Sequence, residues 1–447
     1  MNLENIKEKT VPMILQFSIP SIIAMVLTSL ITIVDGFFIG NYVGKEGIAA
    51  VNLGLPIVYV YLAIGIMFGV GGIAIAGMAL GAQDIKKSND VFNQTVVFTI
   101  IVSVLTSLLV YAFLRPIINI IGMDAQVANC FYNYYSIMVL AYPVMIVNTA
   151  LGMFIRGEGK PQVFMMINIL TVICNVLLDF LFIRWFHLGI EGIAWASIIS
   201  LNIGLICMVL FFLKRSDVFK FKKYRFSKIV LRNTVLNGSS EFIGQMSMSI
   251  AMFAYNWVIL RTAGVDGVAA FTIVGYVAYL FGMVIIGFGQ GASPLISFSY
   301  GAKEFELSQT IRKKTNMFVF LAGAAAMLVM LFASDWYSGI FVSSESVEIL
   351  IQSGIGIFVV SFLFSGINTI TSFYFTSIGK AKESALISSS RGLVVLLICI
   401  FTLPSLFGMT GVWLVAPVTE AITIVLSLVL IRQNENACRT KIQKLHR

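Results

Sequence analysis

Long apolar segments alternate with short polar loops along the whole chain of 447 residues. Each segment is close to the ~20 residues that a helix needs to cross a bilayer. The pattern predicts twelve membrane-spanning helices, at residues 11–39, 50–80, 91–114, 128–154, 161–186, 190–213, 229–261, 267–298, 315–334, 347–377, 383–405 and 409–432. We therefore expect an all-α integral membrane protein without a separate extramembrane domain.

The second half of the chain repeats the first at an offset of 220 residues. Three matching pairs are YVGKEGIAAVN at 42–52 with TAGVDGVAAFT at 262–272, FGVGG at 68–72 with FGQGA at 288–292, and LGAQD at 80–84 with YGAKE at 300–304. Six spans per copy is an even number, so both copies enter the membrane in the same direction. An axis along the membrane normal should relate two pseudo-symmetric six-helix bundles, with the substrate site near the midplane between them. The glycine-rich stretches indicate close helix contacts.

This repeat divides the chain into four parts. We expect an N-terminal bundle (N-lobe) at 1–213, a basic cytoplasmic linker at 214–228, a C-terminal bundle (C-lobe) at 229–432 and a basic tail at 433–447. The linker reads KRSDVFKFKKYRFSK. Its alternating Phe and Lys fit either an amphipathic strip on the anionic inner leaflet or a solvated basic loop.

Composition and charge set the orientation and exclude several classes of protein. Hydrophobic residues make up 58% of the chain, charged residues only 11%, and the net charge is +9. With both termini in the cytoplasm, cytoplasmic segments hold 26 of the 30 Lys and Arg residues, as the positive-inside rule requires. The net charge therefore reflects topology and indicates no nucleic-acid partner. We expect a multi-pass protein of the cell inner (cytoplasmic) membrane, a monomer whose partners are the lipid bilayer and its cargo.

The sequence gives no support for catalysis. The two histidines, His187 and His446, lie outside the predicted spans, and the five cysteines form no CxxC pair. No P-loop, metal box or nucleophile–His arrangement is present, so ATP on this chain cannot power transport. We expect neither an enzyme nor a bound cofactor, apart from a coupling ion.

Four carboxylates fall well inside predicted spans: Asp35, Asp179, Glu241 and Glu420. Each costs about 2.5–3.5 kcal/mol at a helix centre by insertion scales. Such groups usually face the bundle interior or a water-filled cavity and mark ion pathways. They are the candidates for a functional site.

Polar side chains of three N-lobe spans reach a similar depth in the outer half of the membrane. Asn175 and Asp179 are four residues apart, hence on one helix face, and Asp35 and Ser197 lie at matching depth on neighbouring spans. Their oxygens suit a hard cation such as Na⁺, and two adjacent carboxylates can bind a proton instead. The alternative is a buried, hydrogen-bonded aspartate that fixes helix packing.

The repeat separates these two interpretations. The positions equivalent to 35, 175, 179 and 197 hold Tyr255, Val395, Cys399 or Ile398, and Ala416. A purely structural role should tend to appear in both halves. The absence of the polar set from the second half therefore favours ion coupling in the N-lobe.

The remaining intramembrane polar residues leave alternatives open. Glu241 and Glu420 can attract an organic cation, or pair with a neighbouring hydroxyl or with Arg391. Arg391 can also extend toward the interface. Pro20 interrupts the hydrogen-bond ladder of the first span, as a moving hinge or a static kink.

Several segments together resemble the multidrug and toxic-compound extrusion family of secondary transporters. They are IVDGFFIGNYVGKEGIAAVNLGLP in the first two spans, MFGVGGIAIAGMALGAQD at 67–84, NTALGMFIRGEGKP at 148–161, NVLLDFLFI at 175–183 and GIEGIAWASIIS at 189–200. The resemblance covers nearly the whole chain, and the bacterial branch fits best. It implies a twelve-helix, two-lobe antiporter that exports organic cations against Na⁺ or H⁺.

The resemblance also assigns residues. The family's N-lobe cation site carries over to Asp35, Asn175, Asp179 and Ser197, the last usually Thr, and Asn148 resembles a pocket position. Many members carry an acidic residue in the tenth span, which is absent here, and Glu241 lies earlier in its span than the usual carboxylate.

The expected function is antiport of organic cations and drugs by alternating access of the two lobes. One alternative is a lipid-linked oligosaccharide flippase of the same superfamily, and another is a non-transporting membrane scaffold. The intramembrane acids outnumber the bases, which favours cationic cargo over an anionic lipid-linked sugar.

Overall fold

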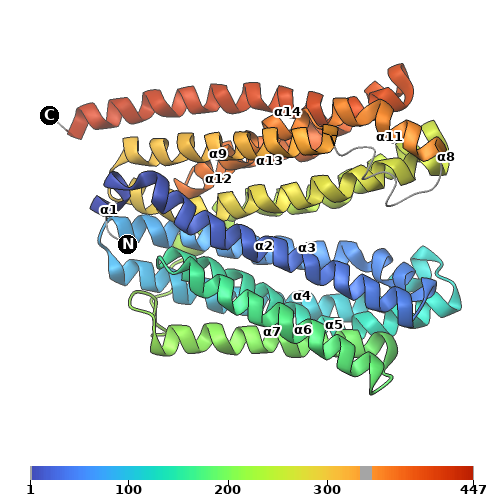
Figure 1. Cartoon of the computed structure of the whole chain (residues 1–447). Helices are drawn as coiled ribbons and strands as arrows, with labels where there is room; N and C mark the ends of the chain where they lie inside the picture. Colours follow the sequence, from blue (N-terminus) through green and yellow to red (C-terminus); the bar gives the residue numbers. More distant parts are fainter. Residues whose placement is uncertain (1–2, 333–344, 446–447) are drawn as a thin grey trace.

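A computed structural model describes residues 3–332 and 345–445, and these residues are overwhelmingly helical (Figure 1). Residues 333–334 of the predicted ninth span lie outside the described residues. The helices are α1 (Leu3–Glu8), α2 (Thr10–Tyr42), α3 (Lys45–Gly81), α4 (Ile85–Ile121), α5 (Ala125–Gly157), α6 (Pro161–Arg184), α7 (Gly189–Lys214), α8 (Lys228–Gly301), α9 (Phe305–Phe332), α11 (Glu345–Phe358), α12 (Ser361–Ser377), α13 (Ala381–Ser389), the π-helical turn η1 (Ser390–Val394) and α14 (Val395–Leu445).

The helices account for the twelve predicted spans. Within the described ranges, nine helical stretches are long and apolar enough to cross a membrane, and the pair α11 and α12, bent by 50°, forms one more span. Two of these stretches contain two spans each. Gly264 in α8 and Gly408 in α14 have positive φ angles and turn the chain back on itself between the two spans. Glycine tolerates such torsions without steric cost. Residues 433–445 of the predicted basic tail continue α14, and residues 446–447 lie outside the described residues.

The spans form two bundles, the N-lobe of α2–α7 and the C-lobe of α8–α14 (Figure 1). Both chain termini lie at one end of the molecule, called the terminal end below. The first residues of the chain pack on the C-lobe, since Ile6, Ile14 and Phe17 share a core with Leu295. Toward the other end, α2 and α8 diverge (Figure 1).

The two lobes meet at the terminal end along a seam of glycines that obeys the sequence repeat. A Cβ atom at Gly81 would meet the carbonyl oxygen of Phe298, and a Cβ atom at Gly301 would meet the carbonyl oxygen of Met78. The repeat relates the two contacts with the lobes exchanged, because Gly301 is 220 residues after Gly81 and Met78 is 220 residues before Phe298. Contacts of this isologous kind are the signature of a two-fold axis.

A second set of contacts extends the seam with the same symmetry. A Cβ at Gly71 would meet backbone atoms of Thr234 and Gly238, and one at Gly291 would meet the backbone of Ser18, the repeat equivalent of Gly238. In contrast, Gly36 and Gly275, farther from the terminal end, have nothing within 4 Å. The lobes are therefore in backbone contact at the terminal end, and α2 and α8 diverge beyond it (Figure 1).

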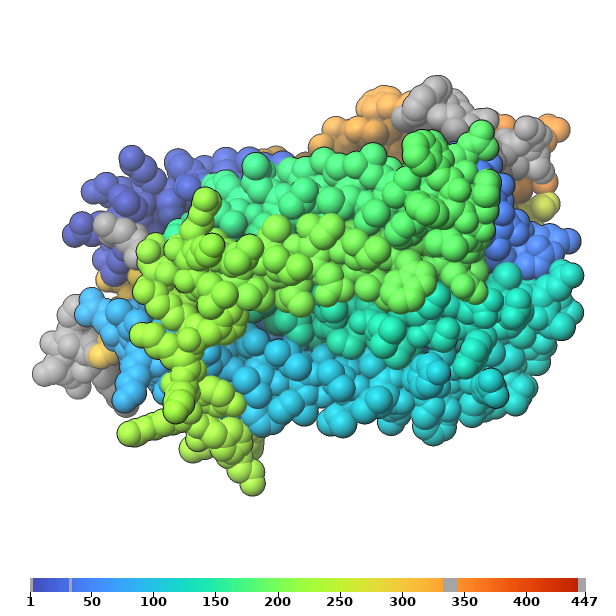
Figure 2. Space-filling view, turned by 90° about the horizontal axis from the view of Figure 1, so that it is seen from below, coloured from blue at the N-terminus to red at the C-terminus, as the bar shows by residue number. Residues whose placement is uncertain are grey.

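Side-chain amides of α4 hold the linker between α7 and α8 on the N-lobe. Asn89 donates to the carbonyl of Val218 (2.6 Å) and accepts from the amide of Lys220 (2.8 Å). Asn93 brackets the next pair of residues in the same way, donating to the carbonyl of Lys220 (2.9 Å) and accepting from the amide of Lys222 (3.1 Å). Figure 2 shows the linker lying against the end of α4.

The aromatic side of the linker faces protein. Phe219 is fully buried, and both Phe219 and Phe221 stack against Phe92 of α4. Phe219 is therefore unavailable to the inner leaflet, whereas Phe221 and Phe226 are 37% and 60% exposed, and for these two an amphipathic strip stays a prediction. Phe219 and Phe221 are two residues apart in a segment that is neither helix nor strand, and both contact Phe92.

Candidate functional site

Two aspartates meet in the N-lobe. Asp35 lies in the last two turns of α2 and Asp179 in the last two turns of α6, far from the terminal end. Their carboxyl groups are close enough to share a side-chain hydrogen bond when one of them carries a proton. The sequence analysis predicted this convergence from helix depth alone.

The two other predicted members of the site lie beside this pair. Asn175, one turn before Asp179, donates to the hydroxyl of Ser197 on α7 at 3.5 Å. Asp179 is fully buried, and Asn175 and Ser197 are 1% and 6% exposed. All four predicted residues therefore lie on the adjacent helices α2, α6 and α7, and we call this polar cluster of Asp35, Asn175, Asp179 and Ser197 the N-lobe chamber.

The oxygens of this chamber lack donors. Both carboxylate oxygens of Asp179, Oδ1 of Asp35 and Oδ1 of Asn175 are buried without a hydrogen-bond donor. Buried polar atoms in proteins are normally satisfied, and each exception requires an explanation. Oxygen ligands of this type fit a hard cation such as Na⁺, and an adjacent carboxylate pair equally fits one shared proton.

Two tyrosines lie near the aspartate pair, and neither was predicted from the sequence. Tyr134 on α5 lies within electrostatic range of both aspartates, and Tyr142 lies within range of Asp35. The hydroxyl of Tyr142 is buried without a partner. Their signal was weak, because aromatic residues are frequent on packed membrane helices and tyrosine carries no formal charge.

A conventional metal centre is absent from the described part of the chain, in the sense that no three His, Cys, Asp or Glu residues cluster. The N-lobe chamber, with two carboxylates, an amide and a hydroxyl, is a different kind of site. It provides hard oxygen ligands and no soft or nitrogen ligand, which suits alkali or alkaline-earth ions rather than zinc or copper.

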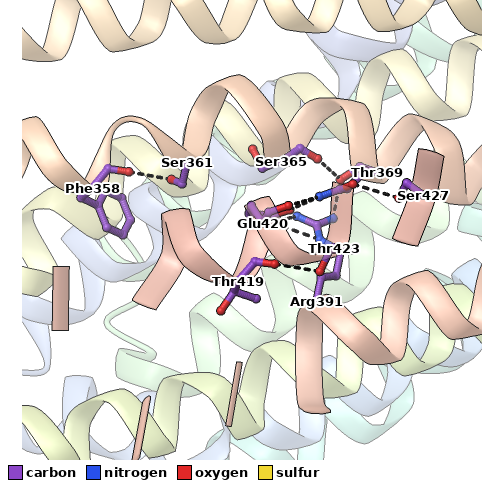
Figure 3. A network of polar contacts seen from close by, with 10 residues as sticks. Phe358, Ser361, Ser365, Thr369, Arg391, Thr419, Glu420, Thr423 and Ser427 are labelled. Atoms are coloured by element: carbon purple, nitrogen blue, oxygen red, sulfur yellow. Dashed lines mark hydrogen bonds and ion pairs between the residues drawn. The ribbon is translucent and has the colours of Figure 1, made fainter. Parts of the chain in front are cut away.

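The C-lobe holds an ion-pair network at the position of Glu420 (Figure 3). The carboxylate of Glu420 accepts from Nη2 of Arg391 at 2.6 Å and from Nε at 3.2 Å. The amide of Asn368 donates to the same carboxylate at 2.7 Å, and Arg391 also donates to the hydroxyl of Thr369. Of the alternatives left open by the sequence, Glu420 therefore adopts pairing with Arg391, and Arg391 points to the bundle interior.

Glu241 is held differently. Its Oε1 is buried without a donor, and Arg391 lies within electrostatic range without forming an ion pair with it. Glu241, Arg391 and Glu420 line one cavity of about 330 Å³ inside the C-lobe. Most of the wall is apolar and includes Met248, Phe281, Met283 and Phe362. Drug-sized ligand pockets begin at about this volume.

Asn148, assigned to a pocket by resemblance, forms a hydrogen bond between two helices in the structure, called an asparagine tie below. Its amide donates to the carbonyl of Leu201 on α7 at 2.9 Å. The equivalent Asn368 donates to the carbonyl of Glu420 at 3.0 Å. Allowing for the one-residue deletion late in the second half, these are the same contact in both lobes. Oδ1 of Asn148 is buried without a donor.

Pro20 lies inside α2, which is one continuous helix from Thr10 to Tyr42. It stands between Ser18 and Ile22, whose backbone atoms contact Gly291 and Gly287 of α8. The predicted hinge is therefore part of the seam between the lobes.

Two homologous six-helix bundles, joined by a glycine seam at one end and carrying buried carboxylates inside, define a multi-pass membrane protein of the transporter type. The MatE family profile matches residues 20–181 and 242–401, one match in each lobe. The chain belongs to this family of multidrug and toxic-compound extrusion transporters, which confirms the resemblance seen in the sequence.

Relatives and solved structures extend along the whole chain. The multidrug export protein MepA of Staphylococcus haemolyticus is 25% identical over 424 residues, covering 94% of this chain and 93% of the relative. MepA of Staphylococcus aureus strain MRSA252 is 25% identical over 423 residues, with the same coverage. A solved structure described as the outward-facing conformation of a multidrug resistance MATE family transporter of the MOP superfamily matches with a TM-score of 0.90 at 22% identity, covering 96% of both chains.

Proposed function

We propose that this protein exports small organic cations from the cell in exchange for Na⁺ or H⁺. The observation that carries the proposal is the Asp35–Asp179 pair, whose buried oxygens lack hydrogen-bond donors. The names of the MepA relatives, multidrug export proteins, support an export function. The protein acts in the cell inner membrane, as a monomer, with the basic terminal end in the cytoplasm.

The aspartate pair couples ion binding to the shape of the N-lobe. Two ionised carboxylates side by side repel each other, and in a buried chamber water does not screen the repulsion. A bound Na⁺ or a shared proton removes that repulsion and draws α2 and α6 together. The ion can drive transport because its affinity differs between the two conformations of the transporter.

The terminal seam sets which side is open. With the lobes in backbone contact at the terminal end and α2 and α8 diverging beyond it, the conformation described above opens toward the outside. Rocking of the two lobes about the repeat axis opens the seam and exposes the interior to the cytoplasm. Pro20, inside this seam, is the hinge of α2 in the proposal.

The cargo is cationic because the C-lobe cavity carries two acids and one base. Glu241, with an unpaired buried oxygen, is the counter-charge for the cargo, and Glu420 is occupied by Arg391. A flippase for lipid-linked oligosaccharide would need basic groups for the diphosphate, and this cavity offers Arg391 alone, already paired with a carboxylate.

Transport in proteoliposomes with separately imposed Na⁺ and pH gradients tests the proposal. We expect Asp179→Asn and Asp35→Asn to lower gradient-driven ethidium transport about tenfold, within the roughly 5–150-fold range of typical coupling free energies. Cys399→Ala, at the equivalent position of the C-lobe, is the matched control and should retain transport within about twofold. Asp179→Asn transporting at the full rate under both gradients would refute the coupling role.

A further inference from the structure

The charge of the C-lobe cavity is controlled by one residue. Among the residues that line it, the formal charges are those of Glu241, Glu420 and Arg391. Arg391 neutralises Glu420 through the ion pair at 2.6 Å, and the two side chains are only 27% and 12% exposed. With both carboxyls ionised, one negative charge therefore remains for a ligand, that of Glu241.

The backbone that carries Arg391 is unusual. Ser390–Val394 form a π-helical turn between α13 and α14. Such turns are rare and occur frequently at functional sites, because the inserted residue changes the direction of the side chains. Gly392, in the same turn, packs against Ser247 of α8, so that the turn is fixed against the first helix of the C-lobe. Arg391 is thus placed in the cavity wall, and a snorkelling arginine would instead extend to the interface.

The wall of the cavity fits a flat, lipophilic body. Phe281, Phe362 and Phe373 and the two methionines surround the carboxylates. Aromatic faces attract organic cations, and methionine side chains adapt to different shapes. The apolar wall discriminates little between flat lipophilic molecules. The charge of the cavity is therefore the main remaining basis for distinguishing one cation from another.

We propose that Arg391 is a specificity-determining residue: as an internal cation it cancels Glu420 and leaves the cavity matched to cargo with a single positive charge. The inference rests on the proposed function, because it names the charge class of the exported cation. Removing the internal cation leaves two carboxylates in the cavity and shifts the preference toward cargo with two positive charges. Removing Glu420 instead leaves Arg391 to oppose Glu241 and shifts the preference further from dications.

The test uses two dyes with the same phenanthridinium ring, ethidium with one positive charge and propidium with two. Their Kd values for the purified protein are measured by fluorescence, and their transport is followed in proteoliposomes. We expect Arg391→Met to shift the ethidium-to-propidium affinity ratio about tenfold toward propidium, the size expected for one charge at ~10 Å with an effective dielectric constant of about 20. We expect Glu420→Gln to shift the ratio in the opposite direction.

Three further variants separate charge from structure. Arg391→Lys keeps the charge and should retain the ratio, and Arg391→Met combined with Glu420→Gln should restore it. Arg261→Met, which removes an arginine stacked on Trp257 outside the cavity, should leave it unchanged. Should Arg391→Met fail to fold, the double variant and Glu420→Gln still give the two required comparisons.

The outcomes are distinct. Equal weakening of both dyes in Arg391→Met, with no change of ratio in Glu420→Gln, would show that the ion pair only braces the helices and would overturn the inference. Wild-type protein that neither binds nor transports either dye would count against the proposed function itself. A changed ratio with intact transport would support both.

Discussion

The two lobes share a backbone plan and differ in where they place charge. Asp35 and Asp179 meet in the N-lobe, and their equivalents Tyr255 and Cys399 also lie close together, within an apolar cluster of the C-lobe. Conversely, the positions of Arg391 and Glu420 correspond to Thr171 and Leu201 in the N-lobe. The proximity of the first pair is retained in the second lobe, and its chemistry is not.

The features that both lobes retain are the ones that hold helices together. The seam contacts of Gly81 and Gly301 exchange under the repeat, and so do the ties of Asn148 and Asn368 to a facing carbonyl. Retention in both lobes therefore distinguishes packing residues from functional residues more directly than burial does. Burial fails to distinguish them because Asp179 is as buried as any core residue.

Substitutions in the seam should test its symmetry with the largest effect on stability. Gly81→Ala and Gly301→Ala each place a methyl group against a backbone carbonyl of the other lobe, and overpacking of this kind costs about 1–3 kcal/mol. We expect the two variants to lower the Tm of the protein in detergent by equal amounts. Gly275→Ala, with nothing within 4 Å, is the control and should not lower it. A large effect at one position alone would contradict a symmetric seam.

The asparagine ties should give a smaller and unequal effect. Asn148→Ala removes one hydrogen bond, worth about 0.6 kcal/mol between membrane helices. Asn368→Ala also removes a bond to the carboxylate of Glu420 and one from Ser427, and a bond to a charged group is stronger than one between neutral groups. Thermal unfolding should therefore show a clearly larger loss for Asn368→Ala. The reverse order would indicate that Asn148 has a further partner.

The linker should give the smallest change in global stability. Asn93→Ala removes two hydrogen bonds to the linker backbone, and their loss opens the linker locally without unfolding either bundle. We expect faster trypsin cleavage at Lys220 to Lys223 with little change in Tm. Asn168→Ala, whose amide bonds only to its own helix, is the matched control. Unchanged cleavage in Asn93→Ala would show that aromatic packing alone holds the linker.

Much of this arrangement was predictable because it depends on simple periodicities. Apolar run length predicted the spans, the constant offset predicted the symmetry, and helix rise predicted that Asp35 and Asp179 meet. The choice of Glu420 rather than Glu241 by Arg391 was not predictable, since it depends on side-chain directions at a π-helical turn. The hydrogen bonds from the α4 amides to the linker were not predictable either, because asparagine near the end of a helix is typical of ordinary solvated surface.

The hydrogen bonds from the side-chain amides of α4 to the linker have a mechanical consequence. Gln94 donates to the carbonyl of Ser227 at 2.9 Å and accepts from its amide at 3.1 Å, and the hydroxyl of Ser227 caps the first turn of α8. The linker between the two lobes is therefore held on α4 as far as Ser227, its last residue before α8. Ser227 is bonded to α4 and also caps the first turn of α8, so no flexible residue separates the two. A tilt of α4 is therefore transmitted directly to the start of α8.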